Sequence, residues 1–446
     1  MSLQKGGLIL TNRELLKDGI LAPVLQMLRS DSAIVRLLTA RSLKGFIFVL
    51  DVDEEHSVYR TFKHLGSKKI TSFIIKIVII TRDPNTQLLP FAGHEKKSES
   101  KETFLSEARI QQDVWIESIR GGRPELSPSV ANLALSDDNI ASYTCISQIH
   151  HIATGSNTLG CLEYLKYMFS NPGNSLGILL MPNIEDSDTL GNYLDTPAIS
   201  PSDKNTVLGN TISNIVRLCI LNKVIHLDLH ADNSLVVPDT KKSFIIDFGT
   251  ATNLSEQGDI YLSDADKAQL LQIVKVFEAK FLDLATHAET RITEKIAFIE
   301  SVCREISDIG RRVNQPMYNY YRGDSTAYQM DWIEADVYNS VDKDSILLHA
   351  FNKLHADYIS IVSRTTDATI KRYIKENMIF DLTKDVSHYS FNFDVKMDEY
   401  DDDDDDDDDD EGKGKTKKQR NKKSKKTKKQ RNNKSKKTRK SYKSKY

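Results

Sequence analysis

Residues 222–250 constrain the fold of this chain more than any other stretch. They contain the pattern H-x-D-x-H-x-x-N, which is formed by His226, Asp228, His230 and Asn233. Fourteen residues beyond Asn233 the chain reads Asp-Phe-Gly, beginning at Asp247. Two short apolar runs around a Pro-Asp turn signal lie between these motifs and predict a β-hairpin. Such a hairpin would bring Asp228 and Asn233 back beside Asp247.

Two carboxylates and a carboxamide held together in this way suit phosphoryl transfer. One carboxylate can orient an attacking hydroxyl and take its proton. A carboxamide and a second carboxylate can hold Mg²⁺ on a nucleoside triphosphate and offset its charge as the terminal phosphoryl group moves. Oxygen ligands suit Mg²⁺, which keeps part of its water shell. The alternative is a surface hairpin with incidental acids, and two motifs at this separation argue against it.

The stretch resembles the catalytic loop and the D-F-G motif of the protein-kinase-like superfamily, including their separation. The resemblance implies that Asp228 is the catalytic base, that Asn233 and Asp247 are metal ligands, and that ATP and Mg²⁺ are the cofactors. His230 occupies the position where serine/threonine protein kinases have a lysine. A histidine there is typical of aminoglycoside- and choline-type phosphotransferases, and we place His230 among the nucleotide-binding residues.

Residues 33–52 are expected to form two strands around a turn. By its position this turn resembles the kinase glycine-rich loop, with Ala40, Ser42 and Gly45 in place of the three glycines. Glycine in such a loop lets backbone N–H groups approach phosphate oxygens. Alanine and serine still permit that approach, in a stiffer loop. Taken alone, the same residues also fit an ordinary hairpin.

Residues 70–80 form a β-branched run suited to a buried strand, and Lys76 interrupts it. A buried ammonium is costly unless it has a partner. The resemblance implies that Lys76 contacts the α- and β-phosphates and pairs with a glutamate of a helix expected over 102–116. We interpret Glu107 as that partner. Glu102 is the competitor, but it lies in the first turn, where the helix dipole explains an acid. The other interpretation is an edge strand with Lys76 facing water.

Residues 176–181 read as a strand, followed by a short connection and a helix start near Thr189. This resembles the last strand of the small kinase lobe and the hinge that binds adenine. The resemblance implies that Met181 is the gatekeeper, that the Pro182 carbonyl accepts a hydrogen bond from adenine, and that the Ile184 N–H donates one. A proline fits because only its carbonyl is needed.

The sequence therefore predicts an α+β, two-lobed protein-kinase-like fold. The expected parts are an N-terminal extension (1–31), a β-rich N-lobe with insertions (32–181), an α-rich C-lobe (182–396) and a disordered charged tail (397–446). Residues 83–100 read as a polar loop and 117–160 as mixed structure. Helices are expected near 12–28, 206–222, 264–277, 285–310 and 329–380. Asp266 is expected to tie the catalytic loop from below.

Two departures from the family pattern bear on the substrate. Leu227 precedes the catalytic aspartate where regulated kinases have arginine, so control by a phosphate docked on that arginine is not expected. No A-P-E motif is present, and the segment between Asp247 and Asp266 is short for peptide docking. A divergent protein serine/threonine kinase is our first prediction. A small-molecule (aminoglycoside- or choline-type) kinase is the alternative, and a nucleotide-binding pseudokinase acting as an interaction module is the third. The intact lysine, base and metal-ligand positions argue against the pseudokinase.

The tail holds opposite charges in separate blocks. Residues 397–446 carry 19 Lys/Arg and 13 Asp/Glu, including the run Asp401–Asp410. The basic block repeats every 11 residues from Thr416 but offers no apolar positions, so disorder is expected rather than a coiled coil. It reads either as an arm for nucleic acid or an acidic partner, or as a solvated tail whose blocks neutralise each other.

Composition bounds the remaining expectations. Outside the tail the chain carries 42 basic and 50 acidic residues, a balance unlike that of a duplex-binding surface. The four cysteines lack the spacing of a disulfide framework or a zinc site. No signal sequence and no apolar run of about 18 residues is present. We expect a soluble, intracellular monomer of the cytoplasm or nucleus that makes no membrane contact and acts on a protein or a small hydroxyl-bearing substrate. Charged tails on divergent kinases suggest large DNA viruses, in which case the location is the host cell or virion.

Overall fold

The computed structural model describes a defined set of residues: 33–51, 72–83, 86–120, 126–128, 130–134, 139–256, 262–287, 291–321 and 332–363. The predicted N-terminal extension and the charged tail lie outside these residues. Their predicted helix and disorder therefore stay predictions, as do the three boundaries between the four predicted parts.

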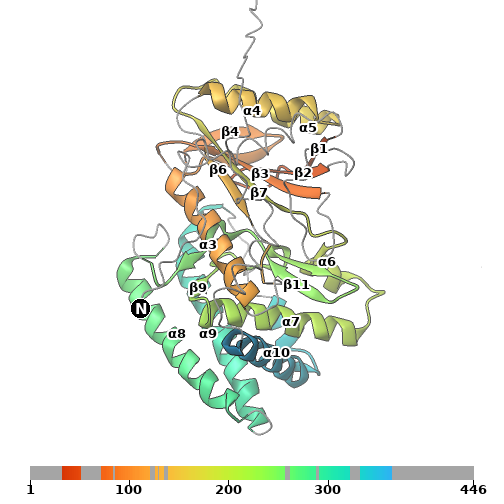
Figure 1. Ribbon diagram of the computed structural model, residues 1–446, viewed down its shortest axis with the longest axis vertical. Coiled ribbons are helices and arrows are strands. Elements are labelled where there is room, and N and C mark those ends of the chain that lie inside the picture. The colour runs from red at the N-terminus through yellow and green to blue at the C-terminus, as the bar shows by residue number, and fades with distance from the viewer. Residues whose placement is uncertain are drawn as a thin grey trace, which may run out of the picture. The chain divides into compact units, whose positions relative to one another are not determined.

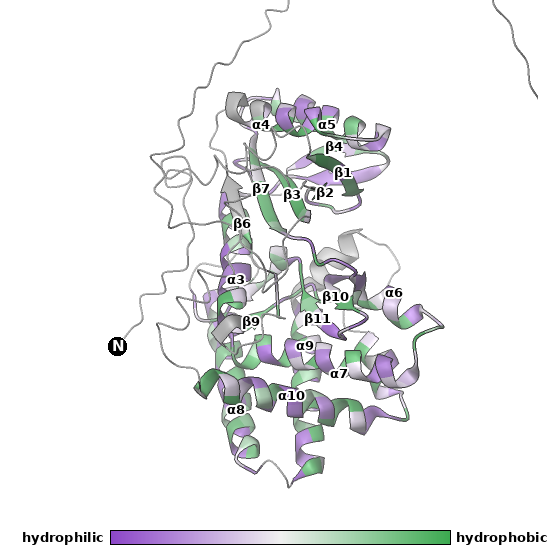
Figure 2. Cartoon of the chain, turned by 45° about the vertical axis from the view of Figure 1, so that its right-hand side comes forward, coloured by the Kyte–Doolittle hydropathy of each residue, from purple (hydrophilic) through white to green (hydrophobic). Residues whose placement is uncertain are grey.

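A five-stranded antiparallel sheet forms the first part of the fold (Figure 1). In spatial order its strands are β1 (Ile34–Thr39), β2 (Phe46–Asp51), β3 (Ser72–Ile80), β7 (Ser175–Pro182) and β6 (Ala131–Ala134). β3 and β7 are almost wholly buried, and Figure 2 shows them among the apolar segments of the chain. β3 lies between β2 and β7, so the interpretation of Lys76 on a water-facing edge strand is wrong.

The alternation of side chains along β3 assigns its two faces to different partners. Ile75 and Ile77 belong to an apolar cluster with α4 (Asn139–His151) and α5 (Ser156–Phe169), and Figure 1 shows these two helices over one face of the sheet. Val78 on the other face packs against α3 (Lys101–Arg120). Lys76 has the same parity as Val78 and therefore lies on the α3 face.

Two stretches have more regular structure than the sequence predicts. The expected polar loop at 83–100 contains a hairpin of β4 (Gln87–Phe91) and β5 (His94–Lys97). This short hairpin has no apolar alternation to reveal it. Tertiary contacts hold it instead, among them the Phe91 ring, 5.4 Å from Phe46 and 5.2 Å from Tyr164 between centroids. The region read as mixed contains β6, α4 and the start of α5.

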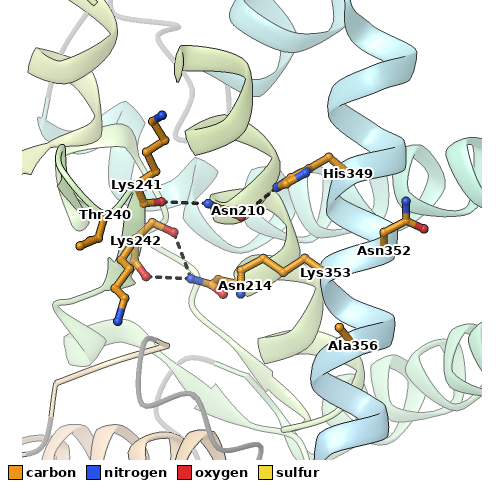
Figure 3. Close-up of a pocket in the computed structure, with 10 residues that line it drawn as sticks. Asn210, Asn214, Thr240, Lys241, Lys242, His349, Asn352, Lys353 and Ala356 are labelled. Carbon is orange, nitrogen blue, oxygen red and sulfur yellow. Dashed lines mark hydrogen bonds between the residues drawn. The ribbon is translucent and has the colours of Figure 1, made fainter. Parts of the chain in front are cut away.

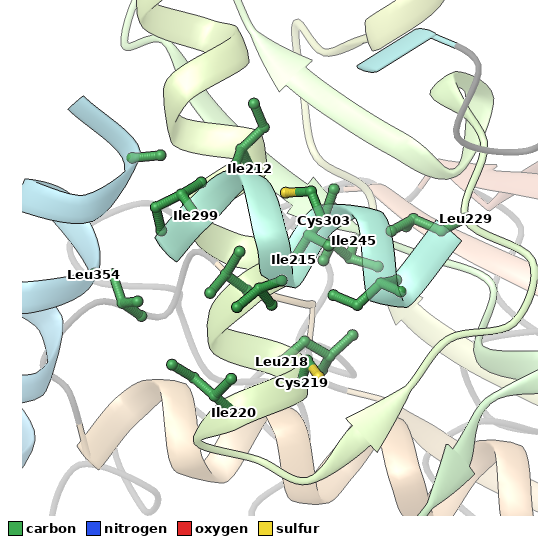
Figure 4. Close-up of a cluster of buried hydrophobic side chains, with 14 of the residues drawn as sticks. Ile212, Ile215, Leu218, Cys219, Ile220, Leu229, Ile245, Ile299, Cys303 and Leu354 are labelled. Carbon is green, nitrogen blue, oxygen red and sulfur yellow. The ribbon is translucent and has the colours of Figure 1, made fainter. Parts of the chain in front are cut away.

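The second part of the fold is helical. Its helices are α6 (Leu190–Asp195), α7 (Pro201–Ile220), α8 (Asp264–Ala285), α9 (Ile292–Tyr321) and α10 (Lys343–Ser363), with a π-helical segment η4 (Ile333–Tyr338) before α10. α7 is the central helix, and Figure 4 shows its apolar residues against Ile299 and Cys303 of α9 and Leu354 of α10. α7 begins five residues before the predicted start because Ser200 caps it and Pro201 occupies its first turn.

The short strands that follow α7 include the predicted hairpin. They are β9 (Val224–Ile225), β10 (Ser234–Val237), β11 (Lys242–Ile245) and β12 (Thr252–Asn253), with the 3-10 turns η2 (Ala231–Asn233) and η3 (Phe248–Thr250) between them. β10 pairs with β11 in antiparallel register and with β8 (Asp188–Thr189) on its other side, which confirms the predicted hairpin.

The chain thus combines a small antiparallel sheet with a helical part, an arrangement consistent with the predicted kinase-like two-lobed fold. Within the described residues no helix has both the length and the apolar character to cross a membrane.

Candidate active site

Three charged side chains from separate elements meet at one point. Lys76 of β3 donates from Nζ to Glu107 Oε1 of α3 at 2.7 Å and to Asp247 Oδ1 at 2.8 Å. Lys76 and Glu107 are buried, whereas the Asp247 side chain keeps 37% of its exposure. Gly249 lies beside this cluster, and a Cβ there would sit 3.3 Å from Asp247 Oδ1, 3.4 Å from Glu107 Oε2 and 3.6 Å from Lys76 Nζ. A larger residue would therefore crowd the cluster.

The position of Glu107 follows from how α3 is anchored at both of its ends. Phe104 and Ala108 pack against β3 and β7, and Ile110 and Val114 belong to the core of the helical part. Toward the C-terminal end of α3, the Glu117 carbonyl accepts a hydrogen bond from Arg217 of α7 at 3.3 Å. α3 is therefore fixed with Glu107 facing Lys76. Glu102, the competing candidate, is exposed in the first turn.

Acidic groups outnumber the cation at this point. Burial alone would lower the pKa of Lys76, but the carboxylates of Asp247 and Glu107 raise it well above its ordinary value. Burial and the neighbouring acids raise the pKa of Glu107 to about 7. Burial opposes ionisation of Asp247 as well, yet the Lys76 ammonium holds its pKa below the usual range. Asp247 is therefore an anion at neutral pH.

A third carboxyl group lies close to this cluster. Glu99 is buried just after β5, and its Oε1 lies 3.5 Å from Nζ of Lys44, a residue of the loop between β1 and β2. Burial raises the pKa of Glu99, and its carboxylate in turn raises the pKa of Lys76. The site thus carries more acid than base, a field that favours a divalent cation.

The segment 226–233 brings Asp228 and Asn233 beside this cluster, where the charges of Asp247 and Lys76 act on Asp228. Asn233 Nδ2 donates to the Asp228 carbonyl at 2.8 Å, which turns the amide oxygen of Asn233 the other way as a potential ligand. Burial raises the pKa of the partly buried Asp228, with the nearby Asp247 carboxylate adding to the shift. A carboxylate with a raised pKa is a better proton acceptor than an ordinary aspartate.

The backbone of this segment is held in strained conformations. Leu227 has φ 62° and Asp247 has φ 60°, values in the left-handed region that non-glycine residues rarely adopt. His226 maintains them, since its Nε2–H donates to the Ile246 carbonyl at 2.9 Å and its own carbonyl accepts from Thr250 Oγ1 at 3.0 Å. Burial lowers the pKa of His226, so the ring is neutral at pH 7.

The oxygen groups fit Mg²⁺ only in part. Asn233 and Asp247 would supply two oxygen ligands, and within the described part of the chain no three His, Cys, Asp or Glu side chains gather to hold a metal by themselves. Mg²⁺ commonly binds through one or two carboxylates together with phosphate and water oxygens. The residues therefore fit a metal ion that arrives with a phosphate-bearing ligand.

Met181 and Pro182 are the last two residues of β7, which extends one residue beyond the predicted strand, and Ile184 comes just after it. Met181 and Pro182 end the strand opposite Ile74 and Phe73 of β3, and the Gln111 amide lies 3.9 Å from the Met181 sulfur. The Ile184 carbonyl accepts a hydrogen bond from Ser187 in a turn. The predicted hydrogen bonds of the Pro182 carbonyl and the Ile184 N–H to adenine stay predictions.

Two other predicted residues have local structural roles. His230 is the N-cap of η2, where its Nδ1 accepts from the Asp232 N–H at 3.2 Å, and contact with a nucleotide stays a prediction. Asp266 is exposed in the first turn of α8 and bonds to the capping residue Ser263. The prediction that Asp266 ties the catalytic loop from below is wrong, because its carboxylate serves the start of its own helix.

The loop between β1 and β2 contains Ala40, Ser42 and Gly45 and is held from an unexpected side. Lys96 of β5 donates from Nζ to the carbonyls of all three residues. The Lys97 N–H also donates to the Leu43 carbonyl at 3.0 Å. Sequence reasoning missed Lys96 because its surroundings are polar and reveal no buried strand. Its burial arises only when β5 folds over the loop.

Gly45 is the one loop position where a side chain cannot fit. Its φ is 112°, and a Cβ there would lie 2.6 Å from the Ile77 carbonyl oxygen and 2.9 Å from a methyl group of Val78. We expect Gly45→Ala to cost about 2 kcal/mol or more of unfolding free energy, measured by urea denaturation. Gly160→Ala in α5, where nothing lies within 4 Å, is the control and is expected to be neutral or stabilising. If Gly45→Ala and Gly160→Ala have equal unfolding free energies, the close packing described at Gly45 is contradicted.

A separate cavity of about 370 Å³ lies among α7, α10 and the β10–β11 turn (Figure 3). Its amides bond to neighbouring protein groups: Asn210 donates to the Lys241 carbonyl at 2.8 Å and pairs with His349 at 2.9 Å, and Asn214 donates to Ser243. These bonds join α7 to α10 and to the hairpin, so we interpret the cavity as a structural polar junction.

The comparisons with known proteins found similarity among solved structures alone. No protein-family model matches the sequence, and no curated protein is similar to it. Among solved structures, the kinase PK-1 of the Cydia pomonella granulovirus is similar to 54% of this chain with 16% identity and a TM-score of 0.27. The similarity spans 59% of the length of that kinase. At this score the likeness carries no argument, and the kinase-like interpretation rests on the chain's own motifs and contacts.

Proposed function

We propose that this chain is an ATP- and Mg²⁺-dependent phosphotransferase that moves the γ-phosphoryl group to a hydroxyl. The observation that carries the proposal is the convergence of Lys76, Glu107 and Asp247 beside Asp228 and Asn233. A buried lysine held by one fixed carboxylate and one partly exposed carboxylate is an arrangement that suits the phosphates and the metal ion of a nucleotide.

Each residue of this group has a proposed task. Lys76, oriented by Glu107, donates to the α- and β-phosphates. Asp247 and the amide oxygen of Asn233 bind Mg²⁺, which supplies charge neutralisation on the phosphates when it is bound. Asp228 orients the acceptor hydroxyl and accepts its proton. The raised pKa of Asp228 supports this last role.

The first candidate acceptor is a serine or threonine hydroxyl of a protein. The second is a small hydroxyl-bearing molecule, and the segment after Asp247 favours it. β12 pairs with β9 only five residues beyond Asp247, and Glu256 forms an ion pair with Arg109 of α3. α8 then begins at Asp264, so little chain remains for docking a peptide.

The test is transfer of labelled γ-phosphate from ATP by the full chain, with Mg²⁺ or with EDTA. The acceptors are the chain itself, one basic and one acidic generic protein, an aminoglycoside and choline. We expect Mg²⁺-dependent label on one class of acceptor, and that class decides between the two candidates. Binding of Mg-ATP without transfer to any acceptor would contradict the proposal and favour a nucleotide-binding module.

A further inference from the structure

The side chain of Lys96 is buried and makes three hydrogen bonds, and the proposed chemistry does not use it. It is 1% exposed, and its Nζ lies 2.5 Å from the Ala40 carbonyl oxygen, 2.6 Å from that of Ser42 and 3.0 Å from that of Gly45. An ammonium has three N–H donors and no acceptor, so three carbonyls satisfy it completely. The Phe46 ring, 4.3 Å from Nζ, adds a cation–π contact.

Lys96 approaches the loop from the face of the sheet opposite to Lys76. Phe46 pairs with Ile77, and both belong to the apolar cluster of the α4–α5 face. Lys76, one residue before Ile77, points to the α3 face. Lys96, stacked on Phe46, therefore pulls the loop carbonyls away from Lys76.

One backbone N–H group of the loop takes the opposite direction. In a trans peptide the carbonyl and the following N–H point to opposite sides. Because the Ser42 carbonyl binds Lys96, the N–H of Leu43 points away from Lys96 and toward the side of the sheet that carries Lys76. The Arg41 N–H, by contrast, donates to Thr39 Oγ1 at 3.1 Å. A backbone N–H with the orientation of Leu43 can donate to a phosphate oxygen.

We propose that Lys96 is a positioning residue for phosphate recognition, which it achieves by binding the Ala40, Ser42 and Gly45 carbonyls so that the loop presents the Leu43 N–H to the nucleotide's phosphates. This inference rests on the proposed function for the identity of the ligand. Ala40 and Ser42 lack the freedom of glycine, and the lysine holds them in a single conformation instead. Burial lowers the pKa of Lys96 to about 8, and the side chain is still mainly an ammonium at pH 7.

The test compares Mg-ATP with adenosine, which lacks phosphates, as ligands of Lys96→Met by calorimetry at pH 7. We expect the Kd for Mg-ATP to rise at least tenfold while the Kd for adenosine changes less than twofold. Lys96→Arg, which keeps the charge and several donors, should recover part of the loss. Lys97→Met, at the neighbouring and partly exposed position, is the matched control and should bind Mg-ATP as the wild type does.

The ratio of the two affinities separates the possible outcomes. If Lys96→Met weakens the binding of Mg-ATP and adenosine equally, or weakens the binding of neither, the role of Lys96 is contradicted. If Lys96→Met does not fold, Lys96→Gln is measured in the same way, and failure of both to fold would show a structural residue only and overturn the proposal. The binding measurement does not depend on turnover. If Lys96→Met raises the Kd for Mg-ATP relative to that for adenosine as expected, but the wild-type chain transfers no phosphate, the role of Lys96 is supported and the proposed function is contradicted.

Discussion

Asp228→Asn is expected to lower the rate of phosphoryl transfer by about a thousandfold, within the range that general-base catalysis contributes. Asparagine has the same shape but cannot accept the hydroxyl proton. The backbone role of residue 228 is kept, because Asn233 binds its carbonyl and not its side chain. The affinity for Mg-ATP should therefore change by no more than about threefold, since a lost base removes stabilisation of the transition state alone.

The measurement is single-turnover transfer to whichever acceptor the wild type labels, together with the Kd for Mg-ATP. Asp239→Asn is the matched control, because Asp239 is exposed in the β10–β11 turn of the same segment. It should transfer phosphate at the wild-type rate. Retention of more than about a tenth of the activity in Asp228→Asn would exclude Asp228 as the base.

Asp357→Ala is expected to lower the free energy of unfolding by about 3–5 kcal/mol, because it removes one partner of a buried ion pair. Asp357 of α10 lies 3.2 Å from Arg217 Nη1 of α7 and 3.4 Å from Lys353 Nζ. The side chains of Asp357 and Arg217 are 0% and 1% exposed, so the variant would leave an uncompensated cation in the core. A loss of this size is a large part of the stability of an ordinary domain.

Urea denaturation followed by circular dichroism measures this effect. Asp308→Ala, which removes a partner of Arg311 in an exposed pair, is the control and should change stability by less than about 0.5 kcal/mol. The double variant Arg217→Met with Asp357→Leu should recover much of the loss, because apolar residues can replace a buried pair. Equal destabilisation by Asp357→Ala and Asp308→Ala would contradict the assigned burial.

The consequence of weakening this pair extends to the candidate site. Arg217 also donates to the Glu117 carbonyl of α3, the helix that carries Glu107. The core of the helical part and the position of Glu107 against Lys76 therefore share a residue.

Local sequence determined the elements whose signal is contained in a few residues. The β10–β11 hairpin follows from two apolar runs around Pro238 and Asp239, and it brings Asn233 near Asp247 as predicted. β3 follows from its β-branched run, and the presence of Lys76 within that run already called for a buried partner. These predictions succeeded because turn chemistry and burial patterns act over short distances.

Tertiary structure alone decided which distant groups meet. α3 contains four glutamates or aspartates, and only packing against two cores turns Glu107 to Lys76 while Glu102 stays exposed. Asp266 is expected from the sequence to contact the catalytic loop, a distant segment, but it bonds locally to the capping residue Ser263 of its own helix. Strand β5 has a polar sequence, and the deep burial of its Lys96 arises only when the side chain reaches three carbonyls from residues 40–45. Contacts between residues more than fifty positions apart leave no periodic signal in the chain, so they are fixed by the packing of whole elements and not by local pattern.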